Sequence, residues 1–278
     1  MTATVSSTAF HVPAWAWIVF LWFIGAWVGS YINLLIYRVP RDLQTVSGPS
    51  YCTSCHNQLE LIDLIPVFSY ALILRGKCRH CGEKVSPRYL IVELISAFSY
   101  VALYLGVGAK LELPAYLVLA STLLALSYID WQTHRLPSKV TYWGGGASVL
   151  LLIAAYLYYG DYSHILWMLI GAGILGGYMF IVWFIYPKGM GFGDVKLSFV
   201  IGAIVGGSGA GVFPLILAML ISFGGQVILG VLWGLVSHKN LRTLYVPFGP
   251  ALAVGALCAI LWGHQFASLL HSVASSRA

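Results

Sequence analysis

Long stretches without a charged side chain dominate this sequence. Asp, Glu, Lys and Arg together make up only 9% of the residues, whereas a typical soluble domain has about 25%. The main uncharged stretches cover residues 12–37, 113–129, 140–160, 162–187, 197–237 and 243–276. Because about 20 helical residues span the hydrocarbon core of a bilayer, the sequence predicts an all-α polytopic membrane protein.

These stretches, together with residues 89–107, in which Glu93 is the single charge, predict about eight transmembrane helices. Stretch 197–237 is too long for one span, and Gly206-Gly207-Ser208-Gly209 is the natural place to divide it. The predicted helices cover residues 13–37, 88–107, 113–131, 139–159, 164–186, 194–207, 210–236 and 247–271. The sixth is short for a span, so it must tilt little, lie in a thinned bilayer, or pack partly inside the protein.

Basic residues predict the orientation of the helices in the membrane. If the N-terminus lies outside and the spans alternate, only Lys110 and Arg277 among the 15 Lys and Arg residues face outward. The other basic residues then lie on the cytoplasmic side, as the positive-inside rule requires. They are Arg38, Arg41, Arg75, Lys77, Arg79, Lys84, Arg88, Arg135, Lys139, Lys188, Lys196, Lys239 and Arg242.

We expect three parts in the chain. Residues 1–37 hold the first helix, residues 38–88 form a small cytoplasmic domain, and residues 89–278 form the membrane core. The middle part contains two Cys-x-x-Cys pairs, whose members are Cys52, Cys55, Cys78 and Cys81. Pairs at this separation predict a four-thiolate zinc site. Four thiolates leave no position for water, so the expected role of zinc is structural.

Other interpretations of the cysteine segment are weaker. Disulfides or unrelated thiols are alternatives, but the cytosol is reducing and argues against disulfides. His56 and His80 adjoin the cysteines and are weaker ligand candidates, while Cys258 in the last predicted helix is expected to be a small buried residue. We expect the basic residues around the second pair to meet anionic headgroups rather than nucleic acid.

Two aspartates lie at the predicted cytoplasmic ends of apolar helices. Asp130 ends the third helix, and Asp194 closes Gly191-Phe192-Gly193-Asp194 and opens the sixth. A carboxylate beside hydrocarbon costs about 2.5–3.5 kcal/mol on insertion scales. When two carboxyl groups lie close together, one keeps its proton while the other is ionised. Such a pair can hydrolyse a peptide with water as the nucleophile and without a metal.

Each aspartate also has a purely structural interpretation. Asp194 could be a helix N-cap, and Asp130 could cap the third helix or pair with Arg135. Against this, Gly191 and Gly193 bracket the approach to Asp194. We expect both glycines to support the site, because glycine permits unusual backbone angles and the close approach of an extended substrate.

A third acid, Glu93, lies about one turn into the second predicted helix. It could bind a neighbouring residue on its own helix or face the catalytic cavity. We expect a supporting role for Glu93 rather than a catalytic one.

Short motifs along nearly the whole chain carry a family resemblance. They lie at residues 29–33, 36–40, 74–78, 86–89, 92–94, 129–137, 189–197 and 247–250. Together they resemble the type IV prepilin peptidases, which are GxGD membrane aspartic proteases and include the prepilin leader peptidase/N-methyltransferases. The resemblance implies that Asp130 and Asp194 are the catalytic dyad.

The resemblance also implies a substrate and a location. The substrate would be a prepilin or pseudopilin of a type IV pilus or protein secretion system. Its basic leader would be cut just before the apolar helix, at the cytoplasmic face of the bacterial inner membrane. Members with the cysteine loop often also methylate the new N-terminus with S-adenosylmethionine. The four cysteines are all present, but methyl-donor contacts cannot be assigned beyond a suggestion of the loop around Gly76.

One position departs from the family pattern, and some alternatives stay open. Ser138 replaces the usual Asp of a Leu-Pro-Asp motif, but serine caps helices well, so the fourth helix should start normally. A peptidase without methyltransferase activity is the first alternative. A transporter is the second, although it would place polar residues deep within several helices, and the third to fifth predicted helices lack charges at mid-depth. A zinc-dependent scaffold, which would survive loss of both aspartates, is the third.

Overall fold

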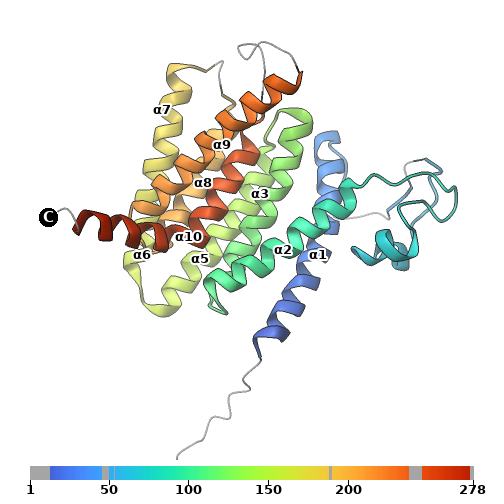
Figure 1. The fold of residues 1–278 in the computed structure, drawn as a ribbon, viewed down its shortest axis with the longest axis horizontal. Coiled ribbons are helices and arrows are strands. Elements are labelled where there is room, and N and C mark those ends of the chain that lie inside the picture. Colours follow the sequence, from blue (N-terminus) through green and yellow to red (C-terminus); the bar gives the residue numbers. More distant parts are fainter. Residues whose placement is uncertain (1–12, 46–49, 53, 188–189, 238–245, 276–278) are drawn as a thin grey trace, which may run out of the picture.

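The computed structural model describes residues 13–45, 50–52, 54–187, 190–237 and 246–275, and these residues are almost entirely helical (Figure 1). Their β-type pairings are two isolated bridges, Tyr51 with Gln58 and Lys77 with Lys84. The prediction of an all-α chain is therefore confirmed. The basic residues Lys188, Lys239, Arg242 and Arg277, and Gly189 of the glycine motif, lie outside the described residues.

Seven segments of the described chain are long and apolar enough to cross a membrane. They are α1 (Ala14–Arg38) with the 3₁₀ turn η1 (Val39–Arg41), α2 (Arg88–Val107), α3 (Leu113–Thr133), residues 138–159, residues 162–185, α9 (Phe213–Ser237) and α10 (Gly249–Ser275). Together with the shorter α8 (Phe192–Gly206) they correspond to the eight predicted helices, with ends that differ by a few residues.

Two of the predicted helices are interrupted by a π-helical turn. Residues 138–159 comprise α4 (Ser138–Val140), η4 (Thr141–Gly145) and α5 (Gly146–Tyr159). Residues 162–185 comprise α6 (Tyr162–Gly171), η5 (Ala172–Gly176) and α7 (Gly177–Ile185). Both turns pack on α8, since added Cβ atoms at Gly145 and Gly176 would collide with Val200 and Phe199. Apolar periodicity does not reveal such single-turn insertions.

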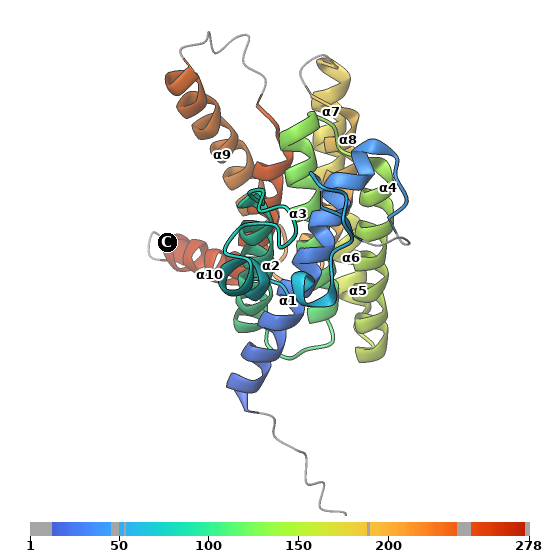
Figure 2. The same cartoon turned by 90° about the vertical axis from the view of Figure 1, so that its right-hand side faces the viewer.

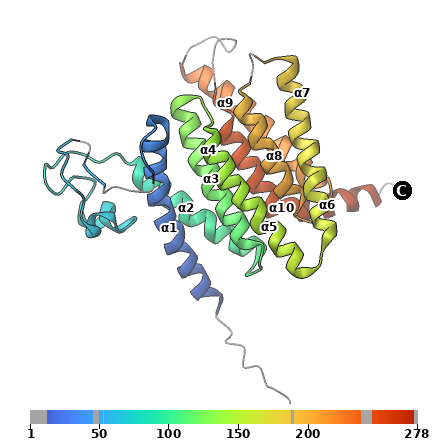
Figure 3. The same ribbon diagram turned by 180° about the vertical axis from the view of Figure 1, so that it is seen from behind.

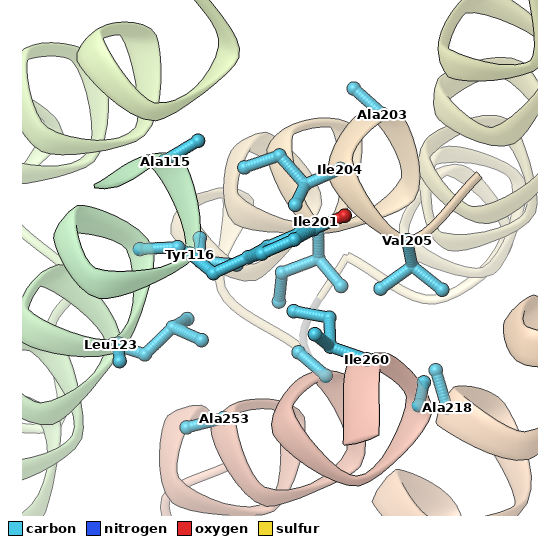
Figure 4. Close-up of a cluster of buried hydrophobic side chains, with 14 of the residues drawn as sticks. Ala115, Tyr116, Leu123, Ile201, Ala203, Ile204, Val205, Ala218, Ala253 and Ile260 are labelled. Carbon is cyan, nitrogen blue, oxygen red and sulfur yellow. The ribbon is translucent and has the colours of Figure 1, made fainter. Parts of the chain in front are cut away.

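The short helix α8 lies inside the bundle. Its 15 residues are about 22 Å long, less than the hydrocarbon core of a bilayer. Figure 4 shows its side chains packing among residues of α3, α9 and α10: Ile201, Ile204 and Val205 meet Tyr116, Leu123, Ala218 and Ile260. Of the three possibilities considered for this short helix, packing inside the protein is therefore the one observed.

Glycines bring α6 and α8 into backbone contact. An added Cβ at Gly171 on α6 would collide with the carbonyl oxygen of Gly202 and lie 2.8 Å from the Cα of Gly206. Gly202 and Gly206 are four residues apart and therefore share one face of α8. Small residues at this spacing are typical of membrane helices whose backbones approach closely.

Glycines also bring the backbones of α1 and α2 into close contact. An added Cβ at Gly25 would lie 2.8 Å from the Cα of Ala97, and one at Gly29 would lie 2.7 Å from the Cα of Glu93. Residues 39–87 connect these two helices and stand beside them at the edge of the bundle, as Figures 1, 2 and 3 agree. This connection contains the short turns η2 (Leu61–Leu64) and η3 (Ser69–Ile73). The connection at residues 39–87, called the cysteine segment below, is therefore anchored at both ends to the closely packed pair of α1 and α2.

The α6–α8 contact gives a stability prediction. We expect Gly171→Ala to destabilise the protein by about 1–3 kcal/mol, because the added methyl group forces the two backbones apart. Gly177→Ala is the matched control, since an added Cβ there meets no atom within 4 Å. Thermal unfolding of both purified variants in detergent measures the difference, and equal midpoints would show that this contact does not hold α8 in place.

Candidate active site and metal centre

Asp130 joins the end of α3 to the beginning of α10. It lies three residues before the last residue of α3, Thr133, and its side chain is buried. Its Oδ2 accepts a hydrogen bond of 2.8 Å from the backbone N–H of Gly249, the first residue of α10. The first N–H groups of a helix have no partner within the helix and carry partial positive charge. This hydrogen bond therefore stabilises the ionised form of Asp130.

Gly249 is a site residue to which the sequence analysis assigned no role. An added Cβ would lie 2.9 Å from Asp130 Oδ2, so only glycine allows the observed approach. The signal was present in the motif Pro247-Phe248-Gly249-Pro250, since proline is frequent in the first turn of a helix. The sequence did not reveal which side chain this helix end would meet.

Asp194 lies in the first turn of α8, but it is not the N-cap. The helix begins at Phe192, with Gly191 as its N-cap, so the predicted start at Asp194 was two residues late. Asp194 is buried, and its Oδ1 has no hydrogen-bond partner among the described residues. An unpaired buried carboxyl oxygen is costly, so this atom is a candidate for binding water or substrate. The N-cap interpretation of Asp194 was wrong.

The two glycines of the motif permit close approach rather than unusual backbone angles. Gly191 has an ordinary extended backbone with φ −71°, and an added Cβ would lie 3.3 Å from Asp194 Oδ2. An added Cβ at Gly193 would lie 2.8 Å from the Cβ of Leu136, in the loop after α3. The expectation of unusual angles was therefore wrong. Gly191 allows the carboxyl group of Asp194 to approach closely, whereas Gly193 allows Leu136 to pack on the first turn of α8.

The fold brings the two aspartates to the same end of the bundle. α3 ends and α8 and α10 begin at this end, the upper one in Figure 1. The carboxyl groups of Asp130 and Asp194 are near enough to repel one another electrostatically. Among the described residues no ion pair joins Asp130 to Arg135. Two acids from distant parts of the sequence thus share one buried site.

Ser138 and Lys196 form a second connection at this site. Lys196 Nζ donates a hydrogen bond of 2.9 Å to Ser138 Oγ and lies over the rings of Tyr142 and Phe192. Ser138 is the first residue of α4, and its side chain makes no capping bond. The expected capping role of Ser138 was therefore wrong, and the serine instead holds the first turn of α8 against the start of α4.

An apolar cavity of about 180 Å³ lies at the end of α3 and includes Trp131, the residue after Asp130. The end of α3, the C-terminal half of α9 and the segment before α10 line this cavity. The lining residues are Trp131, His134, Leu229, Trp233, Val246 and Pro247. The rings of Trp131 and Trp233 meet edge to face with centroids 5.5 Å apart. The cavity therefore offers an aromatic surface at the end of α3, where the residue after Asp130 belongs to its wall.

Glu93 lies elsewhere, under the cysteine segment. It is buried on α2, and its Oε2 accepts a hydrogen bond of 2.7 Å from the backbone N–H of Val67. Glu93 also lines a large cavity of about 730 Å³ between α1, α2 and the cysteine segment. Its supporting role in the aspartate site stays a prediction, since its described contacts connect it to the cysteine segment.

The four predicted zinc ligands lie together. The thiol sulfurs of Cys52, Cys55, Cys78 and Cys81 are all within 4.8 Å of one another. Cys52 Sγ is 3.9 Å from Cys81 Sγ, and Cys55 Sγ is 4.0 Å from Cys78 Sγ. A tetrahedral zinc ion with Zn–S bonds of about 2.3 Å needs sulfurs about 3.8 Å apart, so the donor set fits zinc. His56 and His80 do not belong to this cluster.

The two Cys-x-x-Cys turns have the same backbone hydrogen bonds. The N–H of Cys52 donates to Asn57 O and that of Cys78 to Glu83 O, and the carbonyls of the same cysteines accept from His56 and Gly82. Hydrogen bonds from the backbone N–H groups of Cys55 and Ser54 lower the pKa of the Cys52 thiol to about 6. The first turn thus favours the thiolate form of Cys52, which is the form that binds a metal.

An ion pair ties the second turn to the rest of the segment. Arg79 lies 2.7 Å from Asp63 Oδ1, and the side chain of Asp63 is almost completely buried. Asp63 also accepts a hydrogen bond from the backbone N–H of Glu60. Arg79, expected among the headgroup-binding cations, therefore has a structural partner within the cysteine segment.

The cysteine geometry predicts the metal content of variants. We expect the purified protein to hold about one zinc per chain, and Cys78→Ser to lose most of it, because three thiolates bind zinc much less tightly. Cys258→Ser is the matched control, since Cys258 lies in α10. Elemental analysis by mass spectrometry measures the content, and unchanged zinc in Cys78→Ser would contradict the four-thiolate assignment.

Comparisons with known proteins match nearly the whole chain to one family. Residues 23–107 match the bacterial peptidase A24 N-terminal domain, and residues 117–235 match the type IV leader peptidase family. A prepilin leader peptidase/N-methyltransferase from Pseudomonas putida is 31% identical over 87% of this chain and 89% of its own length. Proteins of the same name from Aeromonas hydrophila and Bacillus subtilis are 29% and 27% identical, over 91% and 89% of this chain and 93% and 95% of their own lengths.

No solved structure matches the chain significantly. The two domain matches meet near the loop between α2 and α3, so one covers α1, the cysteine segment and α2, and the other covers α3 to α9. The second match includes both aspartates. With a relative above 30% identity that it covers almost completely, this chain belongs to the type IV leader peptidase family.

Proposed function

We propose that the chain cleaves the leader peptide from prepilins or pseudopilins with Asp130 and Asp194 as its catalytic acids. The observation that carries this proposal is the meeting of two buried carboxyl groups at one end of the bundle. The names of the relatives support the substrate class.

The surroundings of the two acids suggest different roles for them. Asp130 accepts from the N-terminus of α10, which favours its charged form, so it takes a proton from the attacking water. Asp194 has an unpartnered Oδ1 in a buried site, which favours its protonated form, so it donates to the carbonyl oxygen of the scissile peptide. The water adds to the carbonyl carbon and gives a tetrahedral gem-diol. The C–N bond then breaks while the leaving amine takes up the proton held by Asp130, and Asp194 regains its proton from a gem-diol hydroxyl, so that no covalent enzyme intermediate forms.

The substrate would approach along the membrane surface. A prepilin has a basic leader and an apolar helical stalk, and the cut between them must lie at the boundary of the bilayer. The aromatic cavity at the end of α3, lined by Trp131 and Trp233, is suited to an apolar residue of the substrate. The stalk would pack on the lipid-facing surface of the helices, and the leader would extend into water.

We infer that the end of the bundle with both aspartates faces the cytoplasm, across the bacterial inner membrane. Arg38, Arg41, Arg135 and Lys139 lie at or just beyond the helix ends on this side, while Lys110 lies at the opposite end, between α2 and α3. This distribution agrees with the positive-inside rule. The reducing cytoplasm would also keep the four thiols free for zinc.

We also propose S-adenosylmethionine-dependent methylation of the new N-terminus, because the relatives carry N-methyltransferase in their names. A peptidase without this activity is the remaining alternative. Mass spectrometry of the cleaved pilin separates the two, since methylation adds about 14 Da to the new N-terminal residue. The transporter and scaffold alternatives do not require the two acids to meet.

The dyad is tested by removing one acid at a time. We expect Asp130→Asn and Asp194→Asn each to reduce cleavage of a co-expressed prepilin at least about 100-fold, since each removes one proton-transfer step. Asp161→Asn is the matched control, because Asp161 is the N-cap of α6 at the opposite end of the bundle and Asn also caps helices. Normal processing by either site variant would remove that residue from the mechanism.

The contact between Gly249 and Asp130 is tested by adding one methyl group. We expect Gly249→Ala to lower the cleavage rate about tenfold or more, because the Cβ would displace the Asp130 carboxylate by a fraction of an ångström. Gly224→Ala on α9 is the control, since an added Cβ there meets nothing within 4 Å. A Gly249→Ala enzyme with the normal rate would show that the helix terminus does not position Asp130.

A further inference from the structure

We propose that Gln226 of α9 is a substrate-binding residue, whose amide oxygen accepts a hydrogen bond from a backbone N–H of the pilin segment at the aspartate site. This inference rests on the peptidase half of the proposed function and names a further residue of the same site. Gln226 is the single side-chain amide of α9, in a stretch without charges. Polar side chains in membrane helices typically meet hydrogen-bonding partners rather than lipid.

Gln226 uses only half of its amide group for contacts with the described residues. Its Nε2 donates a hydrogen bond of 2.9 Å to the backbone O of Val246, in the segment before α10. Its Oε1 is buried and has no partner among the described residues. Buried polar atoms of native proteins nearly always have a hydrogen-bond partner. The unused oxygen therefore indicates a donor that comes from elsewhere.

Gln226 lies on the face of α9 that borders the aromatic cavity. Leu229 and Trp233, three and seven residues further along the helix, line that cavity, and so does Val246. Residues at these spacings share one side of a helix. An added Cβ at Gly230, four residues after Gln226, would lie 4.0 Å from Val246 Cγ2. The segment before α10 therefore lies along this face, and the amide of Gln226 is bonded to the wall of the cavity.

The aromatic cavity is accessible from outside and small. Its two tryptophans, Trp131 and Trp233, are 46% and 49% exposed. Figure 2 shows that α9 leans away from α3 toward this end of the bundle. The cavity volume of about 180 Å³ is below the roughly 300–1,000 Å³ of pockets that hold small-molecule ligands. The cavity therefore suits a single side chain of a peptide whose backbone lies along its edge.

A short path through the start of α10 connects Gln226 with Asp130. Asp130 accepts a hydrogen bond of 2.8 Å from the N–H of Gly249, and Gly249 follows Val246 by three residues. Three extended residues reach at most about 10 Å. The amide of Gln226 is therefore no more than about five extended residues away from the carboxyl group of Asp130. One strand of substrate can meet both groups.

An unwound peptide brings the donor that Gln226 lacks. In an α-helix each carbonyl is bonded to the N–H four residues later, and side chains surround the backbone. A peptide bond that water attacks must therefore leave the helix, which frees several N–H groups. At the boundary of the bilayer these groups need acceptors from the protein, because hydrocarbon offers none. The Oε1 of Gln226 is such an acceptor, and it binds the strand through its backbone whatever side chain enters the cavity.

The test uses a synthetic peptide with the leader and first apolar residues of a pseudopilin, in which a methylene-amine replaces the scissile peptide bond and prevents cleavage. In a series of derivatives, a backbone ester replaces one N–H at a time near that bond. Fluorescence polarisation measures binding to the full-length zinc-loaded protein in nanodiscs. On the unchanged protein, one ester should weaken binding about tenfold. Gln226→Met, which keeps a long unbranched side chain, should weaken the parent peptide similarly and abolish the effect of that ester.

Ser222→Ala is the matched control, because Ser222 is a buried polar residue on the same side of α9, one turn before Gln226. Its affinity and ester effects should stay within about twofold of those of the unchanged protein. Two results would overturn the proposal. Esters that all weaken binding less than about twofold would leave the amide oxygen to water alone. Ester effects that persist in Gln226→Met would make the amide a purely structural contact to Val246.

A second measurement needs no substitution and therefore no assumption about the folding of a variant. A diazirine on the peptide residue with the sensitive N–H should label residues 222–237 or 246–250 of the unchanged protein under ultraviolet light. Label that spares both segments would overturn the assignment. Both measurements use an uncleavable peptide, so a failure of the aspartate proposal would appear separately, as normal processing by the aspartate variants.

Discussion

The burial of α8 is the constraint on which the rest of the structure depends. This helix is too short to span a bilayer alone, and its backbone contact with α6 through glycines keeps it inside the bundle. Because neighbouring helices cover it, its first turn can hold a carboxylic acid away from lipid. Asp194 is therefore buried in protein, where a polar partner from another helix can reach it. Without this packing, the glycine motif would be an ordinary helix start at the membrane surface.

Helix ends assemble the site around that acid. The end of α3 brings Asp130, the beginning of α10 brings an N–H group to it, and the loop after α3 packs on Gly193. Backbone groups at helix termini are the ones that remain free for such contacts in a membrane, since all others are bonded within their helices. The same principle applies on the other side of α1, where the N–H of Val67, between two turns of the cysteine segment, fixes Glu93. Two chemical sites are thus built at the margins of one bundle.

Much of this arrangement could be predicted from residue patterns. Seven of the eight predicted helices correspond to described segments long and apolar enough to cross a membrane, and the eighth is the shorter α8. The paired cysteines form a cluster whose sulfur spacing fits zinc. The family resemblance agreed with the matches to known sequences. The predictions that failed concerned local geometry. Ser138 holds Lys196 rather than capping a helix, Asp194 is not an N-cap, and Gly191 has ordinary backbone angles. Each of these depends on a neighbour that is distant in sequence.

By itself, the sequence determined that the chain crosses a membrane several times and where its helices lie. It also identified the acids that are candidates for catalysis and the thiols that are candidates for binding zinc. Hydrophobicity, spacing and residue type are local properties and can be read along the chain. Only the tertiary structure decided that the N–H of Gly249 binds Asp130, that Glu93 contacts the segment with the cysteines, and that an apolar cluster joins α1, α2 and α3. The physical reason is that these contacts join helices through close backbone packing, which depends on how shapes fit in space rather than on any pattern within one segment.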